Sequence, residues 1–175
     1  MLFTLGQRTQ SGDVVDLLLA CHHRIREHIA LARRIANAPA TTAPDSVRAA
    51  AQRVRTYFAM AFPLHRKDEE DDIFPLLIGR SDVLDAAIGE LMRDHDEHEQ
   101  QDAAVVEICA TLENDPSQQH VLAAKLGAAV RALEDEVAEH IGLEERTVFP
   151  AIAMMSTPER ESIVERMQAR REQNP

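Results

Sequence analysis

Apolar positions recur at helical spacing through four long segments of the chain, and short breaks separate these segments. In the first segment, Leu18, Ile25 and Ile29 are seven and four residues apart, which places them on one face of an α-helix. The breaks carry residues that end helices, such as Pro39 and Gly79. We predict four long helices and a shorter fifth one, at about 13–37, 45–78, 81–113, 117–155 and 157–172.

Short connections join the expected long helices, so consecutive helices should be antiparallel neighbours. The predicted fold is all-α: an up-down-up-down antiparallel four-helix bundle with a short C-terminal fifth helix. We expect a single domain over residues 1–175, with the bundle at about 13–155. The fifth helix carries Ile163, Val164 and Met167 and is expected to cap one end of the bundle, with a dimer contact as the alternative.

The second segment has two features that a regular exposed helix would lack. Pro63 lies inside it and has no N–H for the helix ladder, so we expect a kink just before His65. An acidic run follows at 68–72. We expect this run to be a solvated face apart from Glu69, which lies on the apolar side.

Composition and charge narrow the class of protein. Hydrophobic residues make up 45% of the chain and aromatic residues 3%, a mixture that favours helix over sheet or disorder. The net charge of −11, with no long basic run, argues against nucleic acid and anionic membranes as partners. Because the chain shows neither a signal-peptide pattern nor a membrane span, we expect a cytoplasmic protein. Cys21 and Cys109 should be buried, reduced thiols.

One motif occurs twice in the chain, H-x-x-x-E-E-x-x-[IV]-F-P. The first copy begins at His65 and the second begins 75 residues later at His140. A weaker echo, L-x-x-x-H, ends at His22 and again at His95. The first two helices therefore resemble the last two, and we expect the matched histidines to converge near the middle of the bundle, about an approximate two-fold axis.

Each copy of the motif places a histidine and a glutamate four residues apart, as His65 with Glu69 and His140 with Glu144. Four residues advance a helix by about 400°, so both side chains lie on one face. That face is the apolar one, where burial without partners would cost roughly several kcal/mol for each group. Inward-facing histidines and carboxylates commonly hold two metal ions in helical bundles. The pattern therefore favours a metal site over two surface ion pairs.

The other two long helices offer more than one candidate histidine. On the first, His22 lies on the apolar stripe and is the expected ligand, His23 should be solvated, and His28, at the edge of the stripe, is the reserve ligand. On the third, His95 is the expected ligand. His98 lies one turn further on, and three roles are open for it. It could be a fifth nitrogen ligand, a group that supports a ligand from behind, or a solvated side chain.

At these residues the sequence resembles the hemerythrin-like family, specifically its HHE cation-binding domains of the bacterial type. The resemblance covers about 13–155. It implies two iron ions, a non-haem di-iron centre with an oxo, hydroxo or water bridge, whereas the donor set alone would also accept zinc or manganese. It implies four terminal histidines and two bridging glutamates: His22, His65, His95 and His140, with Glu69 and Glu144.

The sequence departs from two branches of that family. Oxygen-carrying hemerythrins resemble H…HxxxE…HxxxH…HxxxxD, whereas His140 here begins HxxxE, and His95 and His98 are three apart. The four-His, two-Glu set is closer to the bacterial iron–sulfur repair and sensing branch. The repair proteins carry paired cysteines in an N-terminal segment, and no cysteine stands before Asp13.

Three functions follow from these observations. The expected one is a di-iron protein that binds or senses oxygen, nitric oxide or iron itself, because six protein ligands leave coordination positions open. The alternative is a di-iron redox enzyme acting on peroxide or nitric oxide, catalase-like or iron–sulfur repair-like. The third is a metal-free interaction bundle. The expected partner is a small diatomic or peroxide ligand, with neither nucleic acid nor membrane; a homodimer through the fifth helix is the alternative to a monomer.

Overall fold

The structure is a computed structural model that describes residues 13–173, with the side chains of 97–101 outside the description. Within this range every regular element is helical and no strand occurs, so the all-α prediction is confirmed. The elements are α1 (Val14–Ala36), α2 (Pro44–Thr56), η1 (Tyr57–Ala61), α3 (Phe62–Lys67), η2 (Asp68–Ile73), α4 (Phe74–Leu77), α5 (Asp82–Asn114), η3 (Pro116–Gln118), α6 (Gln119–Ala153) and α7 (Thr157–Gln173).

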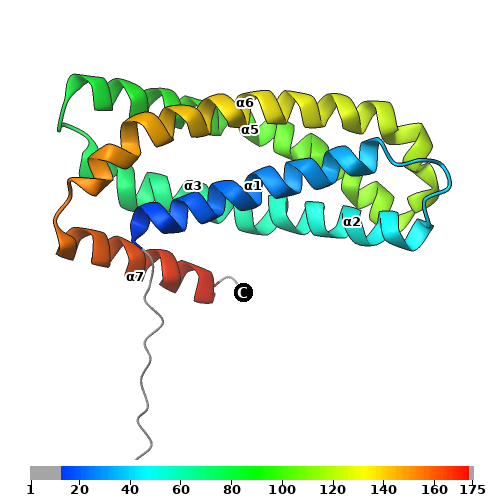
Figure 1. Cartoon of the computed structure of the whole chain (residues 1–175), viewed down its shortest axis with the longest axis horizontal. Coiled ribbons are helices and arrows are strands. Elements are labelled where there is room, and N and C mark those ends of the chain that lie inside the picture. Colours follow the sequence, from blue (N-terminus) through cyan, green and yellow to red (C-terminus); the bar gives the residue numbers. More distant parts are fainter. Residues whose placement is uncertain (1–12, 174–175) are drawn as a thin grey trace, which may run out of the picture.

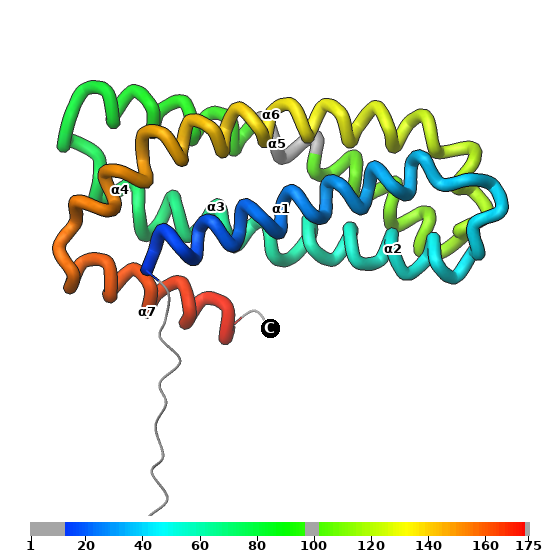
Figure 2. Tube along the Cα trace, viewed as in Figure 1, coloured from blue at the N-terminus to red at the C-terminus, as the bar shows by residue number. Residues whose placement is uncertain are grey.

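The long helical elements lie side by side, as Figure 1 shows. The chain runs along α1, returns through α2 to α4, runs out again along α5 and returns along α6. α1 and α5 each pack against both α2 and α6. α7 lies beside the beginning of α1 and contacts η2 (Figure 2). None of the helices in the described range has an apolar run long enough to cross a bilayer.

Side-chain caps explain why the helices begin where the sequence predicts. The Asp13 carboxylate accepts the backbone N–H of Val14 at 2.7 Å, at the start of α1. Ser81 Oγ accepts the N–H of Leu84 at 3.2 Å, at the start of α5. These groups satisfy N–H donors that the first helical turn leaves without a partner. The observed bounds of the long helices accordingly lie within about two residues of the predicted ones.

The second predicted helix differs from expectation, because two π-helical segments replace the single kink expected before His65. η1 ends where the Phe62 N–H donates to the Tyr57 carbonyl, five residues back. η2 ends where the Phe74 N–H donates to the Glu69 carbonyl, also five residues back. A proline directly follows Phe62 and another directly follows Phe74, and neither can donate to the regular ladder. Each proline is therefore accommodated by one widened turn instead of a break.

The buried apolar side chains form two clusters, one toward each end of the long helices. Ile25, Val105 and Leu133 belong to the first cluster. Leu18 and Leu91 belong to the second. Along α1 and α5, the buried residues between these clusters include polar ones, and His22 and His95, two of the predicted ligands, are among them. Both cysteines are buried and free, as expected. The core is thus divided by a polar level, and the functional site lies there.

Candidate metal centre

Six polar side chains meet between the two apolar clusters, and each is at most 6% exposed. They are the six residues that the sequence singled out, and they come from all the long helical elements. His22 lies on α1, His65 on α3, Glu69 on η2, His95 on α5, and His140 and Glu144 on α6. The structure therefore brings together every predicted site residue, while their role as ligands remains a prediction that rests on chemistry.

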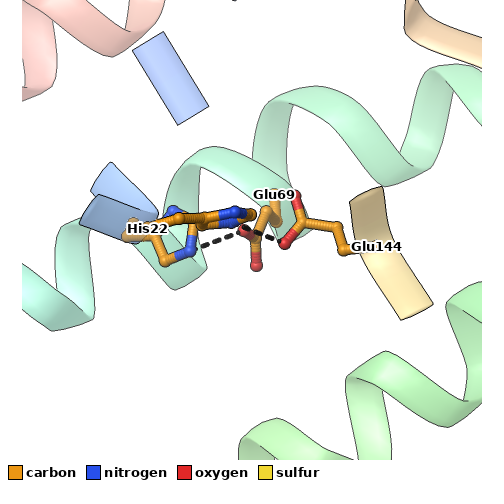
Figure 3. A group of neighbouring side chains, drawn as sticks. His22, Glu69 and Glu144 are labelled. Carbon is orange, nitrogen blue, oxygen red and sulfur yellow. Dashed lines mark hydrogen bonds and ion pairs between the residues drawn. The ribbon is translucent and has the colours of Figure 1, made fainter. Parts of the chain in front are cut away.

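The six side chains form two groups that share Glu69. Within each group, the atoms able to bind a metal lie within 4.8 Å of one another. The first group is His22, His65, Glu69 and Glu144, and the second is Glu69, His95 and His140. Figure 3 shows His22, Glu69 and Glu144 converging from three different elements. Two adjoining groups with one common carboxylate are an arrangement in which two cations could sit side by side.

Glu69 is surrounded by imidazoles but is poorly hydrogen-bonded. Its Oε1 lies 2.9 Å from His65 Nε2, and its Oε2 lies 3.1 Å from His95 Nε2. Nevertheless, neither oxygen has a partner with hydrogen-bond geometry in the described part of the chain. A buried carboxylate in this condition is costly unless a cation compensates its charge. A metal bound between the carboxylate and the imidazoles would satisfy both oxygens.

The other contacts among the six side chains also leave buried polar atoms without suitable hydrogen-bond partners. Glu144 Oε2 lies 3.0 Å from His22 Nε2, but its Oε1 has no hydrogen-bond partner among the described residues. His95 Nε2 and His140 Nε2 face each other at 3.3 Å. Two imidazole nitrogens at this distance can share a proton, or both can direct lone pairs at a common metal. The donor set therefore fits a metal centre better than a closed hydrogen-bond network.

Three of the four histidines have a carboxylate behind the ring, on the side away from the centre. A carboxylate that accepts the Nδ1–H fixes the tautomer and leaves the Nε2 lone pair for a metal. The Nδ1-to-oxygen distances are 2.9 Å for His22 and Glu145, 2.6 Å for His95 and Glu70, and 3.2 Å for His140 and Asp94.

Sequence reasoning missed these outer carboxylates, although a signal for two of them was present. Glu70 and Glu145 are the second glutamates of the repeated H-x-x-x-E-E motif, and each orients a histidine on a different helix. Asp94 has no comparable sequence signal, since its partner His140 lies 46 residues away. The two adjacent glutamates of the motif therefore have different roles. The first faces the centre, and the second orients the imidazole of a histidine on another helix.

The pKa of His140 is shifted in the opposite direction from those of His65 and His95. Burial lowers the pKa of His140 to about 3. The Glu69 carboxylate raises this pKa, and the nearby imidazoles lower it further. Burial would also lower the pKa values of His65 and His95, but Glu69 outweighs it and raises both. Without a metal, the Glu69 carboxylate therefore favours the protonated forms of His65 and His95, whereas burial favours the neutral form of His140.

Metal uptake is consequently expected to weaken as the pH falls. The pKa values of His65 and His95 are raised, so these rings hold protons to a higher pH than free imidazoles do, and a metal must displace those protons. Each proton released would change the apparent affinity by about tenfold per pH unit. Competition titrations with a metal-binding dye at pH 6, 7 and 8 would measure this slope. An affinity that does not change over this range would show that the site is not protonated before metal binds.

The expectation that the acidic run 68–72 is a solvated face was wrong for Asp68 and Asp72, whereas Asp71 is exposed. Asp68 is fully buried and Asp72 is 3% exposed. Arg170 donates to Asp68 at 2.5 Å and to Asp72 at 2.7 Å. Arg171 donates to Asp68 at 2.5 Å, and Arg166 donates to Asp72 at 2.6 Å. These cations come from α7, about 100 residues further along the chain, so local sequence could not reveal them.

The other candidate histidines do not join the two groups. His23 is exposed, as expected. The reserve ligand His28 stacks on Tyr57, with ring centroids 3.9 Å apart, and its Nδ1 lies 2.7 Å from the Arg24 carbonyl oxygen. His28 is therefore occupied outside the centre. The His98 side chain lies outside the described residues, so its predicted roles stay open.

The comparison with known families agrees with this site. The family model for the hemerythrin HHE cation-binding domain matches residues 13–152, which is most of the chain. The chain therefore belongs to the hemerythrin HHE cation-binding domain family. No curated protein matches the sequence. Family membership and the two His/Glu groups together identify a metal-binding helical protein.

Proposed function

We propose that the chain is a non-haem di-iron protein built as an up-down-up-down four-helix bundle. One observation carries the proposal: two groups of ligand atoms share the buried carboxylate of Glu69. A carboxylate placed in this way can bridge two ions, one bound with His22 and His65 and the other with His95 and His140. Glu144 belongs to the first group alone, so its predicted bridging role rests on the family resemblance.

Two iron ions would supply a redox-active pair with open coordination positions. The residues around them have separate tasks. Carboxylates behind His22, His95 and His140 keep each Nε2 directed at the centre. The apolar clusters above and below exclude water from the site. The alternating direction of the long helices in Figure 1 supports the proposed bundle topology.

We propose further that the natural ligand is very small, such as oxygen or nitric oxide. A cavity of about 10 Å³ adjoins the centre, which is room for roughly one water molecule. Its walls combine three of the candidate ligands with Arg66 and with apolar side chains, among them Phe62 and Val137. A cavity of this size and lining suits a diatomic molecule and excludes an organic substrate.

Filling this cavity should impair ligand binding without removing the metal. Val137→Ile adds one methyl group to a wall of the cavity and is expected to weaken nitric oxide binding about tenfold, since overpacking costs on the order of 1–3 kcal/mol. Val130→Ile is the matched control, because Val130 is buried on the same helix but does not line the cavity. Absorption spectra during nitric oxide titration would compare the variants at equal iron content. Equal affinities in both would argue against this cavity as the binding place.

The experiment that tests the proposed function measures iron and reactivity together. Purified chain should contain about two iron ions, as the two groups of ligands predict. Exposure to oxygen and to nitric oxide should then shift its absorption spectrum. Steady oxygen release from peroxide, or steady loss of nitric oxide, that disappears in Glu144→Ala would instead favour the enzyme. A chain without bound iron would contradict the proposal.

A further inference from the structure

We propose that a second site, separate from the small cavity, binds an organic anion with an apolar body. The site is a cleft of about 730 Å³ between α1, the end of α2, η1 and the C-terminal part of α7. Cys21 and His65 belong to its lining, so the cleft reaches the side of the metal centre. The inference does not depend on which metal the centre holds.

The charge of the cleft is opposite to that of the whole molecule. Arg24, Arg53 and Arg171 line it, and no Asp or Glu is among its described lining residues. The chain as a whole carries a net charge of −11. A local excess of cations in an acidic protein attracts anions to that place, and a low-dielectric wall strengthens the effect.

Two of the three arginines form no ion pair with any carboxylate among the described residues. Arg24 donates to Cys21 Sγ at 3.1 Å, and within the described residues it has no ion pair. Arg53 likewise has no ion pair in that part of the chain. Arg171, by contrast, is held by Asp68 at 2.5 Å. Arg24 and Arg53 are therefore the groups able to hold a carboxylate, phosphate or sulfate through paired N–H donors.

The apolar part of the cleft comes mainly from η1, while His28, Gln52, Thr56 and His65 add polar groups to the lining. Tyr57, Met60 and Ala61 of this π-helical segment line the cleft together with Leu64. Met60 is 58% exposed, so its side chain is accessible to a ligand in the cleft. The widened turn of a π segment changes the direction in which successive side chains point, and such segments are frequent at functional sites. The lining thus pairs an anion-binding rim with an apolar wall.

The ligand that fits these two features is amphipathic. Its anionic group would lie between Arg24 and Arg53, and its apolar part would cover Met60 and Leu64. Pockets for small molecules usually combine a largely apolar lining with a few polar groups that fix orientation. A medium-chain carboxylate is the simplest molecule with this shape and charge. Bound here, it would lie next to His65 and close the cleft over that edge of the metal centre.

Octanoate is the probe that tests this inference, by isothermal titration into the purified full-length chain. Octanoate should bind at least about tenfold more tightly than octanamide, which lacks the charge, and than acetate, which lacks the chain. Arg53→Gln and Arg24→Gln should each weaken octanoate binding by about tenfold. Arg34→Gln is the matched control, because Arg34 is exposed on α1, does not line the cleft and changes the net charge equally.

Each other outcome overturns the inference. If octanamide bound as tightly as octanoate, the negative charge would not select the ligand. If acetate bound as tightly as octanoate, the apolar wall would contribute nothing to binding. Equal octanoate affinity in the Arg24, Arg53 and Arg34 variants would remove the arginines from the site. Iron content, measured on the same samples, separates this result from the proposed function, since a chain without iron can still bind octanoate here.

Discussion

Glu69→Ala is expected to abolish metal binding at both positions, whereas His22→Ala should weaken only one. Glu69 is the only residue common to both groups of ligand atoms in the described part of the chain, and His22 belongs to the first group alone. Loss of a metal ligand should lower the affinity for the metal by on the order of 100-fold or more, because loss of a carboxylate that only orients a ligand already lowers it by about 10- to 100-fold. Metal per chain, measured by elemental analysis after dialysis, would check this order of effects.

The control for this prediction is His23→Ala. His23 directly follows His22 but is 73% exposed and pairs with Glu27 at 3.2 Å, so its removal should leave the metal content unchanged. Retention of metal in Glu69→Ala would contradict the shared-carboxylate arrangement. A fall in metal content in His23→Ala equal to that in His22→Ala would show a general loss of folding instead of a loss of ligands. Helical content measured by circular dichroism would distinguish these cases.

Arg170→Met is expected to lower the free energy of unfolding by about 3–5 kcal/mol, because it leaves two buried carboxylates with incomplete compensation. Arg170 bridges Asp68 and Asp72, and its own side chain is only 17% exposed. Burial already raises the pKa of Asp68 although Arg171 and Arg170 oppose it. The loss of one arginine should therefore push Asp68 further toward protonation and loosen α7 from η2. Chemical denaturation of the purified variant would measure the change.

Arg33→Met provides the matched comparison for this variant. Arg33 and Glu134 also form an arginine–carboxylate pair, at 2.9 Å, but their side chains are 53% and 39% exposed. An exposed pair of this kind contributes about 0–1 kcal/mol. Similar losses in the two variants would mean that burial of Asp68 and Asp72 has little energetic consequence. Since Asp68 precedes Glu69 in η2, the Arg170 variant should also bind metal more weakly, which elemental analysis would show.

The segment η2 connects α7 with the candidate metal centre. η2 carries Asp68, Glu69 and Asp72, so one short segment presents one face to the centre and another face to α7. In a regular helix, residues four apart such as Asp68 and Asp72 share a face, and Glu69 points about 100° away from Asp68. The arginines of α7 therefore hold the segment from outside while Glu69 faces inward. This explains physically why a C-terminal helix outside the matched family region contributes to the site.

Periodicity predicted the helices, and the apolar stripes together with the repeated motif singled out the six residues that the structure brings together. An imidazole or carboxylate on an apolar stripe must find a partner, and this requirement is visible in sequence, because the stripe shows which face is buried. The repeat then pointed to a shared level for His65 and His140. The outer carboxylates were harder to foresee. Glu70 and Glu145 look like solvated neighbours of the ligands until the facing helices are placed beside them.

The sequence by itself therefore determined the helical segments, the polar level between two apolar clusters and the identity of the residues that meet there. Tertiary structure alone decided the contacts between distant segments. Glu69 is common to two groups, and Arg170 of α7 neutralises Asp68, because chain segments far apart in sequence pack side by side. Helical spacing fixes the direction of a side chain within its own helix. Helical spacing carries no information about which side chain of a neighbouring helix will face that position.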